Sequence, residues 1–498
     1  MSDIRVTYSG LINFIVGILI IFTGLIFILI VTRTVTPQEF GTWNLINNLV
    51  FYVVIVEPFI SFWATRETAR DERTGKTAVL SSGMFSVVLI FAYIILANFL
   101  GFQTDANQQI LLLGAVLVPL VFVNYTLTGI NLGWKPQAIG YSTICFGITE
   151  LVMALIFVYH LGLGVPGIII SAAVGYIPSI IILTIFGREQ ISNRFRKEFL
   201  KKWLKRFWLP LYPQMGTLVR TLDVIVFTLI TGSVIGLAFW AAARAITTLV
   251  AASGTISKAM YAKLIQGDRT EILQENITLL FYFAFPLTAI SIIFAKPTLF
   301  ALNPIYEPAA LIVVVLSLGV FFWVLSNTFQ TFLRGIENVD VDKNVTFMDL
   351  IKSKLFSIPT IVLVQSIIHI VALTVGLILL SDSPQLDLVL YWACVELIVQ
   401  IPFTGYFYIS LKRSVSFKLE VKRLLKYLLS TVVIFSLIYI LLEKYLIYKI
   451  ELIEFIPSLI LFVALGVGAY LIVTYFTDNK IRELFQAIIQ EIRKKKDN

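Results

Sequence analysis

Charged residues are scarce in this 498-residue chain. Asp, Glu, Lys and Arg make up 14% of it, whereas 58% is hydrophobic, and the mean hydropathy is +0.89. This composition excludes a water-soluble globular domain and indicates a polytopic membrane protein. The net charge of +9 would suggest nucleic acid in a soluble chain. Here Lys and Arg cluster in short loops between apolar segments, so we expect them to meet anionic lipid headgroups and expect no nucleic-acid partner.

Cysteine and histidine are almost absent, with two residues of each type. Cys145 and Cys394 both fall in apolar segments, which excludes a disulfide framework and a thiolate metal site and leaves packing as their role. His160 and His369 lack the spacing of metal ligands, so we read both as isolated polar residues. We therefore expect neither a metal nor a cofactor.

Long apolar stretches dominate what remains. Stretches able to cross roughly 30 Å of hydrocarbon follow one another from residue 10 to residue 476, which predicts about fourteen transmembrane helices in an all-α polytopic membrane protein. Leu11 to Val31 lacks a preceding basic region and a following cleavage site, so we read it as a retained first helix.

Lysine and arginine gather in alternate loops, as the positive-inside rule requires of short cytoplasmic loops. The richest segments are the run Arg188–Arg206 and the tail Lys494–Lys496. The opposite loops hold only Arg33, Lys296, Lys444 and Lys449. We therefore predict a multi-pass protein of the cytoplasmic membrane with both termini in the cytoplasm.

The long basic run divides the chain into two sets of six helices and a final pair. An even number of helices per half puts both halves the same way up, related by a pseudo-two-fold axis along the membrane normal. The predicted divisions are an N-lobe at 1–187, a basic amphipathic cytoplasmic linker at 188–207, a C-lobe at 208–415, and the terminal helix pair with an amphipathic tail at 416–498. In the linker, Phe195, Phe199, Trp203 and Phe207 recur at every fourth position, which predicts a helix lying on the membrane surface.

Ionisable residues inside spans are costly and usually face a cavity or a partner, so they are the candidate site residues. Arg220 lies about 18 Å into the seventh span, and Asp223 follows one helical turn later. Arg244 adds a second cation about 12 Å into the eighth span. Pro210 and Pro213, with Gly216, can break or bend the seventh helix.

Further candidates lie in other spans. Lys352 stands at the inner start of the eleventh helix, beside Lys354, and Asn327 is one of the polar residues near the end of the tenth. The acids of the first half are Glu57, before Pro58, and Glu150, and the twelfth helix adds Glu396. Cations are thus concentrated in the second half of the chain and acids in the first.

The first outer turn resembles a known family. Its sequence, Thr34-Val-Thr-Pro-Gln-Glu-Phe-Gly-Thr-Trp43, is similar to the proline-acidic-phenylalanine-glycine start of helix two in Wzx-like polysaccharide-biosynthesis flippases, in the superfamily that also contains MATE exporters and MurJ-type lipid flippases. A second glycine, Gly236, opens helix eight. The resemblance implies a two-lobed transporter that moves a polyprenyl-(pyro)phosphate-linked oligosaccharide outward by alternating access. Its implied partners are membrane lipids, cytoplasmic glycosyltransferases and a polymerase or oligosaccharyltransferase outside.

Two interpretations of the charged residues remain. In the functional one, Arg220 with Asp223, Arg244 and Lys352 hold the anionic headgroup, Asn327 contacts sugar, and Glu57 or Glu150 carries a coupling proton or sodium ion. In the structural one, Arg220 and Asp223 form an intrahelical pair, the lysines reach lipid headgroups, and the glutamates are protonated packing groups.

Two other function classes are weighed against a flippase. A MATE-like exporter of small organic cations needs an acidic and aromatic site, whereas the candidate site here centres on arginines. A membrane glycosyltransferase or ligase needs a nucleophile or a metal-binding acidic cluster in a sizeable loop. No loop exceeds about twenty residues, and Asp382 and Asp387 are too sparse, so we expect no enzyme. The chain also lacks a glycine-rich phosphate motif with lysine, which argues against ATP-driven transport.

Overall fold

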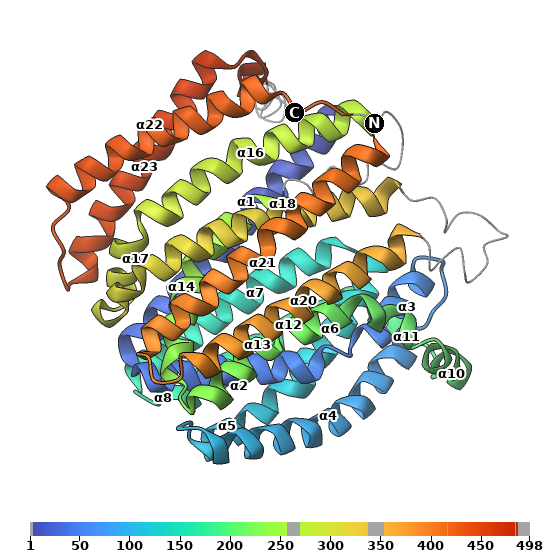
Figure 1. Ribbon diagram of the computed structural model, residues 1–498. Coiled ribbons are helices and arrows are strands. Elements are labelled where there is room, and N and C mark those ends of the chain that lie inside the picture. The colour runs from blue at the N-terminus through green and yellow to red at the C-terminus, as the bar shows by residue number, and fades with distance from the viewer. Residues whose placement is uncertain (1–2, 256–268, 337–352, 416, 484, 487–498) are drawn as a thin grey trace. The chain divides into compact units, whose positions relative to one another are not determined.

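The computed structural model describes residues 3–255, 269–336, 353–415, 417–483 and 485–486. Within these residues the chain forms helices and no strand (Figure 1). Eleven of the described helices are long and apolar enough to cross a membrane, and one bent pair raises the number to twelve. Two shorter apolar helices, Ile20–Thr34 and Ile235–Ala251, come in addition. The all-α polytopic fold class is confirmed, whereas the count of fourteen spans is not.

The chain packs into two compact units. Unit 1 contains Met1–Ile21, Ala243–Leu355 and Glu396–Asn498, and unit 2 contains Phe22–Ala242 and Phe356–Val395. Four helices contribute residues to both units, namely α1 (Asp3–Thr34), α14 (Ile235–Ala251), α20 (Lys354–Leu379) and α21 (Gln385–Ser414). The division into lobes at residues 187 and 208 stays a prediction.

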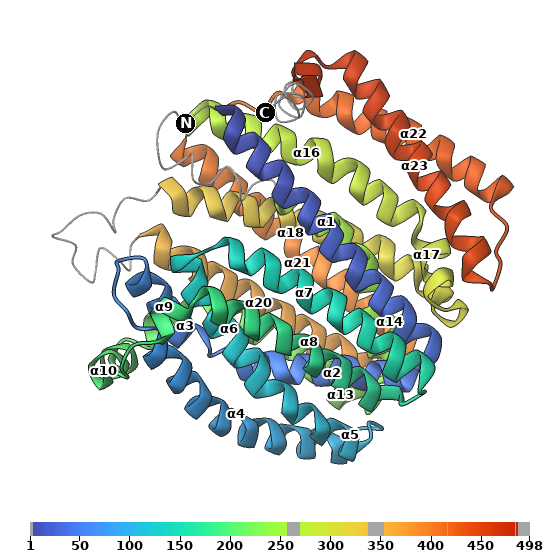
Figure 2. The ribbon, with the colours of Figure 1, turned by 180° about the vertical axis from the view of Figure 1, so that it is seen from behind.

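Unit 2 is built from the helices of the first half of the chain and from α20, which comes from its second half (Figures 1 and 2). Its described helices are α2 (Pro37–Val54), α3 (Pro58–Thr68), α4 (Gly75–Gln103), α5 (Gln108–Leu113), α6 (Leu117–Trp134), α7 (Gln137–Ala154), α8 (Gly164–Phe186), α9 (Arg188–Ile191), α10 (Lys197–Lys205), α11 (Trp208–Leu211), α12 (Met215–Arg220), α13 (Leu222–Thr231) and α20 (Lys354–Leu379, of which unit 2 holds Phe356 onward).

The start of α2 shows why its sequence begins a helix there. Thr36 accepts the backbone N–H of Glu39, and the Glu39 carboxylate accepts the backbone N–H of Thr36 at 2.8 Å, while Pro37 occupies the first helical position. This reciprocal capping satisfies two backbone donors that a helix start leaves open.

After α2, the chain bends by 58° into α3 just before Pro58. A proline at that point removes a backbone donor and accounts for the break.

The basic linker is not one surface helix. Its helical parts are α9 and α10, and between them the backbone N–H of Arg196 donates to Oγ1 of Thr77 at 2.9 Å. Phe195 therefore lies outside both helices. The expectation that four aromatic residues share one helix face is wrong, because the chain leaves the helix to bond to α4.

Trp203 of α10 is buried in protein. Its indole N–H donates to Oε2 of Glu67 at 3.1 Å, and Lys202 Nζ lies 3.0 Å from Oε1 of the same carboxylate. Phe207, one turn further on, is exposed. These contacts attach α10 to α3 of unit 2, while Lys201 and Lys205 are exposed.

The seventh span is segmented, as the two prolines predict. It runs as α11, a 3₁₀ turn at Tyr212–Gln214 that contains Pro213, α12 and α13. The irregular turn follows from the missing proline N–H and the clash of its ring with the preceding turn. The break separates the short α11 from the part of the span that carries Arg220 and Asp223.

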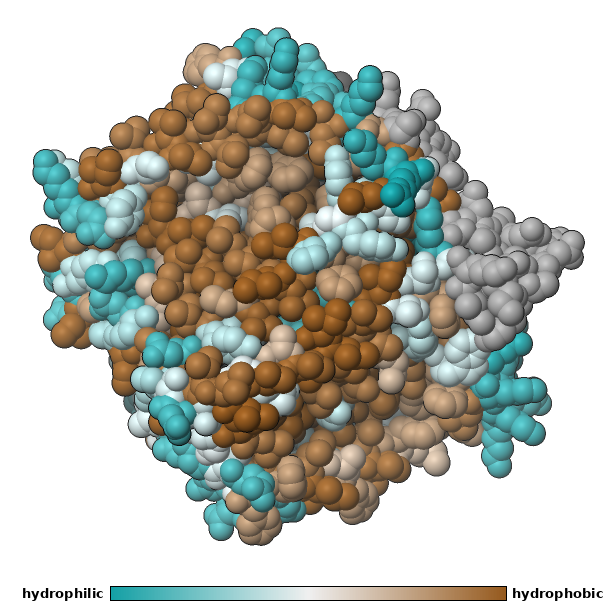
Figure 3. All heavy atoms as spheres, in the orientation of Figure 1, coloured by the Kyte–Doolittle hydropathy of each residue, from teal (hydrophilic) through white to brown (hydrophobic). Residues whose placement is uncertain are grey.

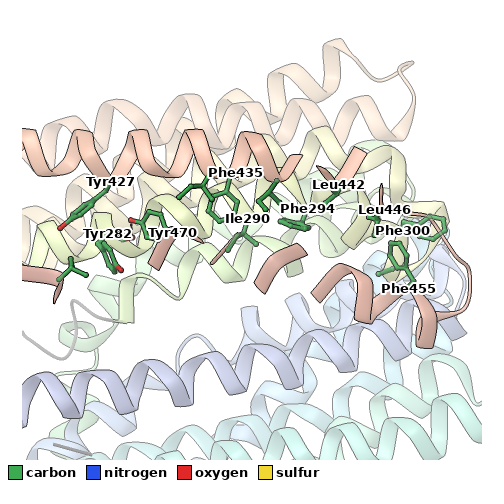
Figure 4. Close-up of a cluster of buried hydrophobic side chains, with 14 residues drawn as sticks. Tyr282, Ile290, Phe294, Phe300, Tyr427, Phe435, Leu442, Leu446, Phe455 and Tyr470 are labelled. Atoms are coloured by element: carbon green, nitrogen blue, oxygen red, sulfur yellow. Dashed lines mark hydrogen bonds between the residues drawn. The ribbon is translucent and has the colours of Figure 1, made fainter. Parts of the chain in front are cut away.

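Unit 1 is organised around an aromatic core between its helices (Figure 4). Tyr282, Phe435 and Tyr470 come from three different helices of this core, and the hydroxyl of Tyr470 donates to the backbone carbonyl of Tyr282 at 2.9 Å. The terminal helix pair, α22 (Val421–Tyr445) and α23 (Leu452–Thr477), therefore packs on α16 (Arg269–Ile293) and is part of unit 1. Unit 1 also contains α17 (Ala295–Leu302) and α18 (Ala310–Ile336).

Large apolar side chains remain exposed along the spans. On α20 they include Val364, Ile368, Val371 and Val375, and Figure 3 shows apolar side chains covering the visible side of this helix. A soluble protein would bury such a surface, whereas a bilayer solvates it. The exposure agrees with a helical membrane protein.

Candidate functional site

Arg220 and Asp223 lie on either side of a small irregularity in the seventh span. Arg220 is the last residue of α12, Thr221 separates the two helices, and Asp223 lies in the first turn of α13. Asp223 is buried, and its Oδ1 accepts the backbone N–H of Val224 at 2.7 Å. An acid in the first turn of a helix is favoured by the helix dipole. Arg220 is half-buried.

His369 of α20 is the neighbour of Asp223 that the sequence did not reveal. Its Nε2 lies 3.7 Å from Oδ2 of Asp223, and His369 is 2% exposed. The interpretation of His369 as an isolated polar residue is therefore wrong. The one signal in the sequence is that both residues are ionisable and lie inside spans, where such groups usually have partners.

Arg244 and Glu396 form an ion pair within unit 1. Nη1 of Arg244, on α14, lies 3.1 Å from Oε1 of Glu396, on α21. The Glu396 side chain is 4% exposed and the Arg244 side chain 43%. The carboxylate is thus inside the bundle, while the Arg244 side chain is partly exposed.

A groove in unit 1 surrounds Asn327. It holds a cavity of about 330 Å³ between the end of α14 and the last turns of α18. Trp323, Asn327, Gln330 and Arg334 are among its lining residues. Its remaining lining residues are Ala251, Gly254, Thr255, Val324, Thr328 and Thr331. Among the lining residues that the structure describes, none is acidic.

Arg244 and the groove share one helix. Ala251, which lines the groove, follows Arg244 by two helical turns, so the two residues lie on the same face of α14 about 10 Å apart along its axis. Arg244 lies on α14 and Asn327 on α18, and both helices contribute lining residues to the groove.

Glu57 is buried at the bend between α2 and α3. Its Oε2 accepts the hydroxyl of Ser61 at 2.7 Å, and its Oε1 accepts the hydroxyl of Thr126 at 2.8 Å. Both carboxylate oxygens are thus hydrogen-bonded, one within the same segment and one across to α6. The carboxylate can accept these two bonds and still offer lone pairs to an ion.

Glu150 of α7 lies where α7 and α8 approach closely. A Cβ at Gly175 would stand 3.2 Å from Cβ of Glu150, so the glycine leaves room for the acid.

Lys352 lies outside the described residues. Its neighbour Lys354 is described, and its Nζ donates to Oγ of Ser414 at 2.7 Å in an exposed position. This contact joins the first residue of α20 to the last residue of α21. Within the ranges that the structure describes, no three His, Cys, Asp or Glu residues cluster as metal ligands.

Comparison with solved structures identifies the fold. An inward-facing structure of a multidrug resistance MATE family transporter of the MOP superfamily has 12% sequence identity and a TM-score of 0.60, and the alignment covers 80% of this chain and 98% of that one. An outward-facing structure of such a transporter has 14% identity and a TM-score of 0.57, with coverage of 83% and 97%.

A third structure is of a MOP superfamily transporter from Pyrococcus furiosus, whose description reads "reverse polarity of binding pocket suggests different function". It has 13% identity and a TM-score of 0.57, and the alignment covers 83% of this chain and 97% of that one. Comparison with family models and with curated protein sequences found no match. The chain is a multi-pass helical membrane protein with a fold similar to that of these MOP superfamily transporters.

Proposed function

We propose that the protein is a transporter that moves a polyprenyl-(pyro)phosphate-linked oligosaccharide across the cytoplasmic membrane by alternating access. The similar folds include one solved facing inward and one solved facing outward, which supports a mechanism of this kind. The Wzx-like resemblance of the first outer turn supports the substrate class. Both termini are proposed to be cytoplasmic, and glycosyltransferases with a polymerase or oligosaccharyltransferase are the proposed partners.

The groove of unit 1 carries the proposal. A lipid-linked oligosaccharide combines sugars, which stack on aromatic rings and bond to amides, with a phosphate or pyrophosphate, which guanidinium groups bind in charge-assisted pairs. Trp323, Asn327 and Gln330 match the first part, and Arg334 with Arg244 matches the second. The described lining contributes a positive charge and no negative one.

Residues outside the groove have supporting roles in the proposal. Arg220, beside Asp223, is a candidate headgroup ligand in unit 2, and Lys352 is a further candidate. Glu57, with both oxygens hydrogen-bonded, and Glu150 are the proposed carriers of a coupling proton or sodium ion. A carboxylate inside a span is retained when an ion or a partner uses it.

Export of small organic cations is the second candidate function. Two of the similar structures are described as multidrug resistance transporters, which favours it. The buried Glu396 would be its anionic site, but Arg244 already lies 3.1 Å from this carboxylate. A groove with a guanidinium and no described acid repels a cation, so the anionic substrate is favoured.

Binding to the purified protein separates the two functions. The probes are undecaprenyl pyrophosphate, an anion, and tetraphenylphosphonium, a cation. We expect the anion to bind, and Arg244→Gln and Arg334→Gln each to weaken it by about tenfold, the effect of losing one charge-assisted hydrogen bond. Arg413→Gln, which removes the same charge from an exposed position on α21, is the control. Binding of the cation alone would replace the proposal by the second function.

Complementation of a bacterial strain that lacks its oligosaccharide flippase tests transport in cells. Arg220→Ala should abolish complementation at normal abundance in the membrane. Trp323→Ala should reduce it, whereas Trp208→Ala should not. These two tryptophans are 40% and 44% exposed, so their truncation removes similar surface, but only Trp323 lines the groove. Equal effects of the two substitutions would remove Trp323 from the sugar site.

A further inference from the structure

The seventh span and α20 lie side by side in unit 2. Tyr212 stacks on Phe356 with ring centres 4.4 Å apart, and its hydroxyl is 2.6 Å from that of Thr360. A Cβ at Gly216 would stand 2.8 Å from the side chain of Val362. The residue numbers of the contacting pairs rise together along both helices, so the two helices run in the same direction.

Further along the same contact between the seventh span and α20, Asp223 lies close to His369. Nε2 of His369 has no hydrogen-bond partner among the residues that the structure describes, although the side chain is only 3% exposed. The distance of 3.7 Å from Nε2 to Oδ2 of Asp223 is longer than a hydrogen bond and short enough to become one with a shift of about 1 Å. The imidazole is thus aimed at a carboxylate but is not yet bonded to it.

We propose that His369 and Asp223 form a reversible proton-binding site. Histidine is the side chain whose charge changes near physiological pH, and a carboxylate within about 4–6 Å favours the charged form. A proton taken from water onto Nε2 converts the contact into a charge-assisted N–H···O bond to Oδ2, and release of the proton to water reverses it. The Asp223 side chain is 13% exposed and the His369 side chain 3%.

Other ionisable groups on the packed helices shape this equilibrium. They are Arg220, one turn before Asp223, Tyr212 at the start of the seventh span, and Tyr391 of α21, whose hydroxyl donates to the backbone carbonyl of Ala372 on α20 at 2.7 Å. Tyr212 and Tyr391 are each held by a hydrogen bond. Arg220 is the one permanent cation of the set.

Arg220 and a protonated His369 would compete for one carboxylate. Residues three positions apart in helical backbone are surface neighbours, so Asp223 can serve Arg220 when His369 is neutral. Protonation of His369 draws the Asp223 carboxylate toward α20, which changes the charge around Arg220 and thereby its attraction for an anion. This coupling to an anionic headgroup rests on the proposed function, whereas the proton site itself does not.

The chain has two histidines, so nuclear magnetic resonance can observe His369 alone. His160 is exposed at the end of a π-helical turn, and His160→Gln leaves His369 as the single imidazole. With isotope-labelled histidine in lipid nanodiscs, we expect the ring signals to change reversibly between about pH 5 and about pH 8. Asp223→Asn in the same background should alter this transition, because it removes the carboxylate that faces Nε2.

Two outcomes would overturn the proton site. Ring signals that stay constant across this range would identify a neutral packing histidine, and a transition that Asp223→Asn leaves unchanged would remove the carboxylate from the site. The charge-matched control is Asp387→Asn, which neutralises an exposed acid of α21 and should leave the transition in place.

Transport tests the coupling separately. In proteoliposomes, the rate at which a fluorescent polyprenyl-phosphate probe crosses should change about fivefold or more over the same pH range, and His369→Gln should flatten this dependence while His160→Gln keeps it. A pH dependence that survives in His369→Gln would overturn the coupling. Absence of any transport in the unsubstituted protein would refute the proposed function and leave the result on the proton site standing.

Discussion

Arg244 Nη1 lies 3.1 Å from Glu396 Oε1, and the two partners differ in exposure, with the carboxylate buried and the guanidinium nearly half in the open. Loss of the ion pair costs more free energy at the buried Glu396 carboxylate than at the half-exposed Arg244 side chain, because only the carboxylate has lost most of its hydration. The pair can therefore be both a structural contact and a binding group, and the two roles predict different results.

Arg244→Gln should destabilise the protein by about 1–2 kcal/mol, because it leaves a buried carboxylate without this cation; the value is below that for a fully buried pair since Arg244 is half-exposed. The double variant Arg244→Gln with Glu396→Gln should regain most of the lost stability. Thermal unfolding in detergent, followed by the loss of the monodisperse peak, measures both. If the double variant also regained binding of undecaprenyl pyrophosphate, Arg244 would be a structural partner only.

The second prediction concerns the attachment of α10. Trp203→Ala should open this helix, because it removes a fully buried indole and leaves Glu67 without one of its donors. Truncation of a buried tryptophan costs about 3–5 kcal/mol. Trypsin cleavage near Lys201 and Lys205 should therefore become at least about tenfold faster. Phe207→Ala, at an exposed aromatic residue, should leave the cleavage rate unchanged, and equal rates in the two variants would contradict the attachment.

The third prediction is a pH dependence of unit 1. A hydrogen bond from Arg423 lowers the pKa of Glu420. Burial raises the pKa of Asp478, but hydrogen bonds from Arg423 and Tyr427 outweigh it, so this pKa also lies below its ordinary value. A lowered pKa in the folded state contributes stability that is complete above the ordinary value, near pH 4, and is lost as the pH falls through the folded value.

The melting temperature should therefore hold steady from about pH 7 to about pH 5 and fall below about pH 4. Asp478→Asn should destabilise the protein at neutral pH by roughly 2 kcal/mol, because it loses charge-assisted bonding, and should reduce the further loss on acidification. Asp382→Asn, which neutralises an exposed acid, is the control. An identical acid profile in Asp478→Asn would show that other carboxylates govern it.

The composition and the spacing of apolar stretches were enough to predict the helical membrane fold, because crossing a bilayer imposes length and hydropathy on each span separately. The break in the seventh span was likewise predictable from Pro210 and Pro213, since proline acts on its own helix. The bend before Pro58 is of the same kind. These features depend on neighbours in the sequence.

The partners of the site residues were not predictable in this way. Glu396 pairs with Arg244, and His369 lies beside Asp223, across distances in sequence that no periodicity along one helix encodes. The prediction for the basic linker was wrong for a related reason. Its aromatic spacing is typical of a helix on a membrane surface, but the buried Trp203 donates a hydrogen bond to Glu67. Tertiary contacts thus decided which polar residues meet. The sequence identified candidate site residues but not which of them contact one another.

The last prediction concerns Gly41, which follows Phe40 in the first turn of α2. A Cβ at this position would overlap the backbone carbonyl of Val234, and the carbonyl carbon would be 2.8 Å away. Backbone atoms cannot turn aside as a flexible side chain can. Gly41→Ala should therefore destabilise the protein by about 1–3 kcal/mol through overpacking.

Gly83 of α4 is the matched control. A Cβ there would meet nothing within 4 Å, so Gly83→Ala gains helix propensity without a clash and should stabilise by about 0.5–1 kcal/mol. Thermal unfolding of the two variants in the same detergent should move in opposite directions. A stabilising effect of Gly41→Ala would mean that α2 and the segment before α14 do not touch at this point. Since both glycines lie in helices, only the close backbone approach at Gly41 can reverse the sign.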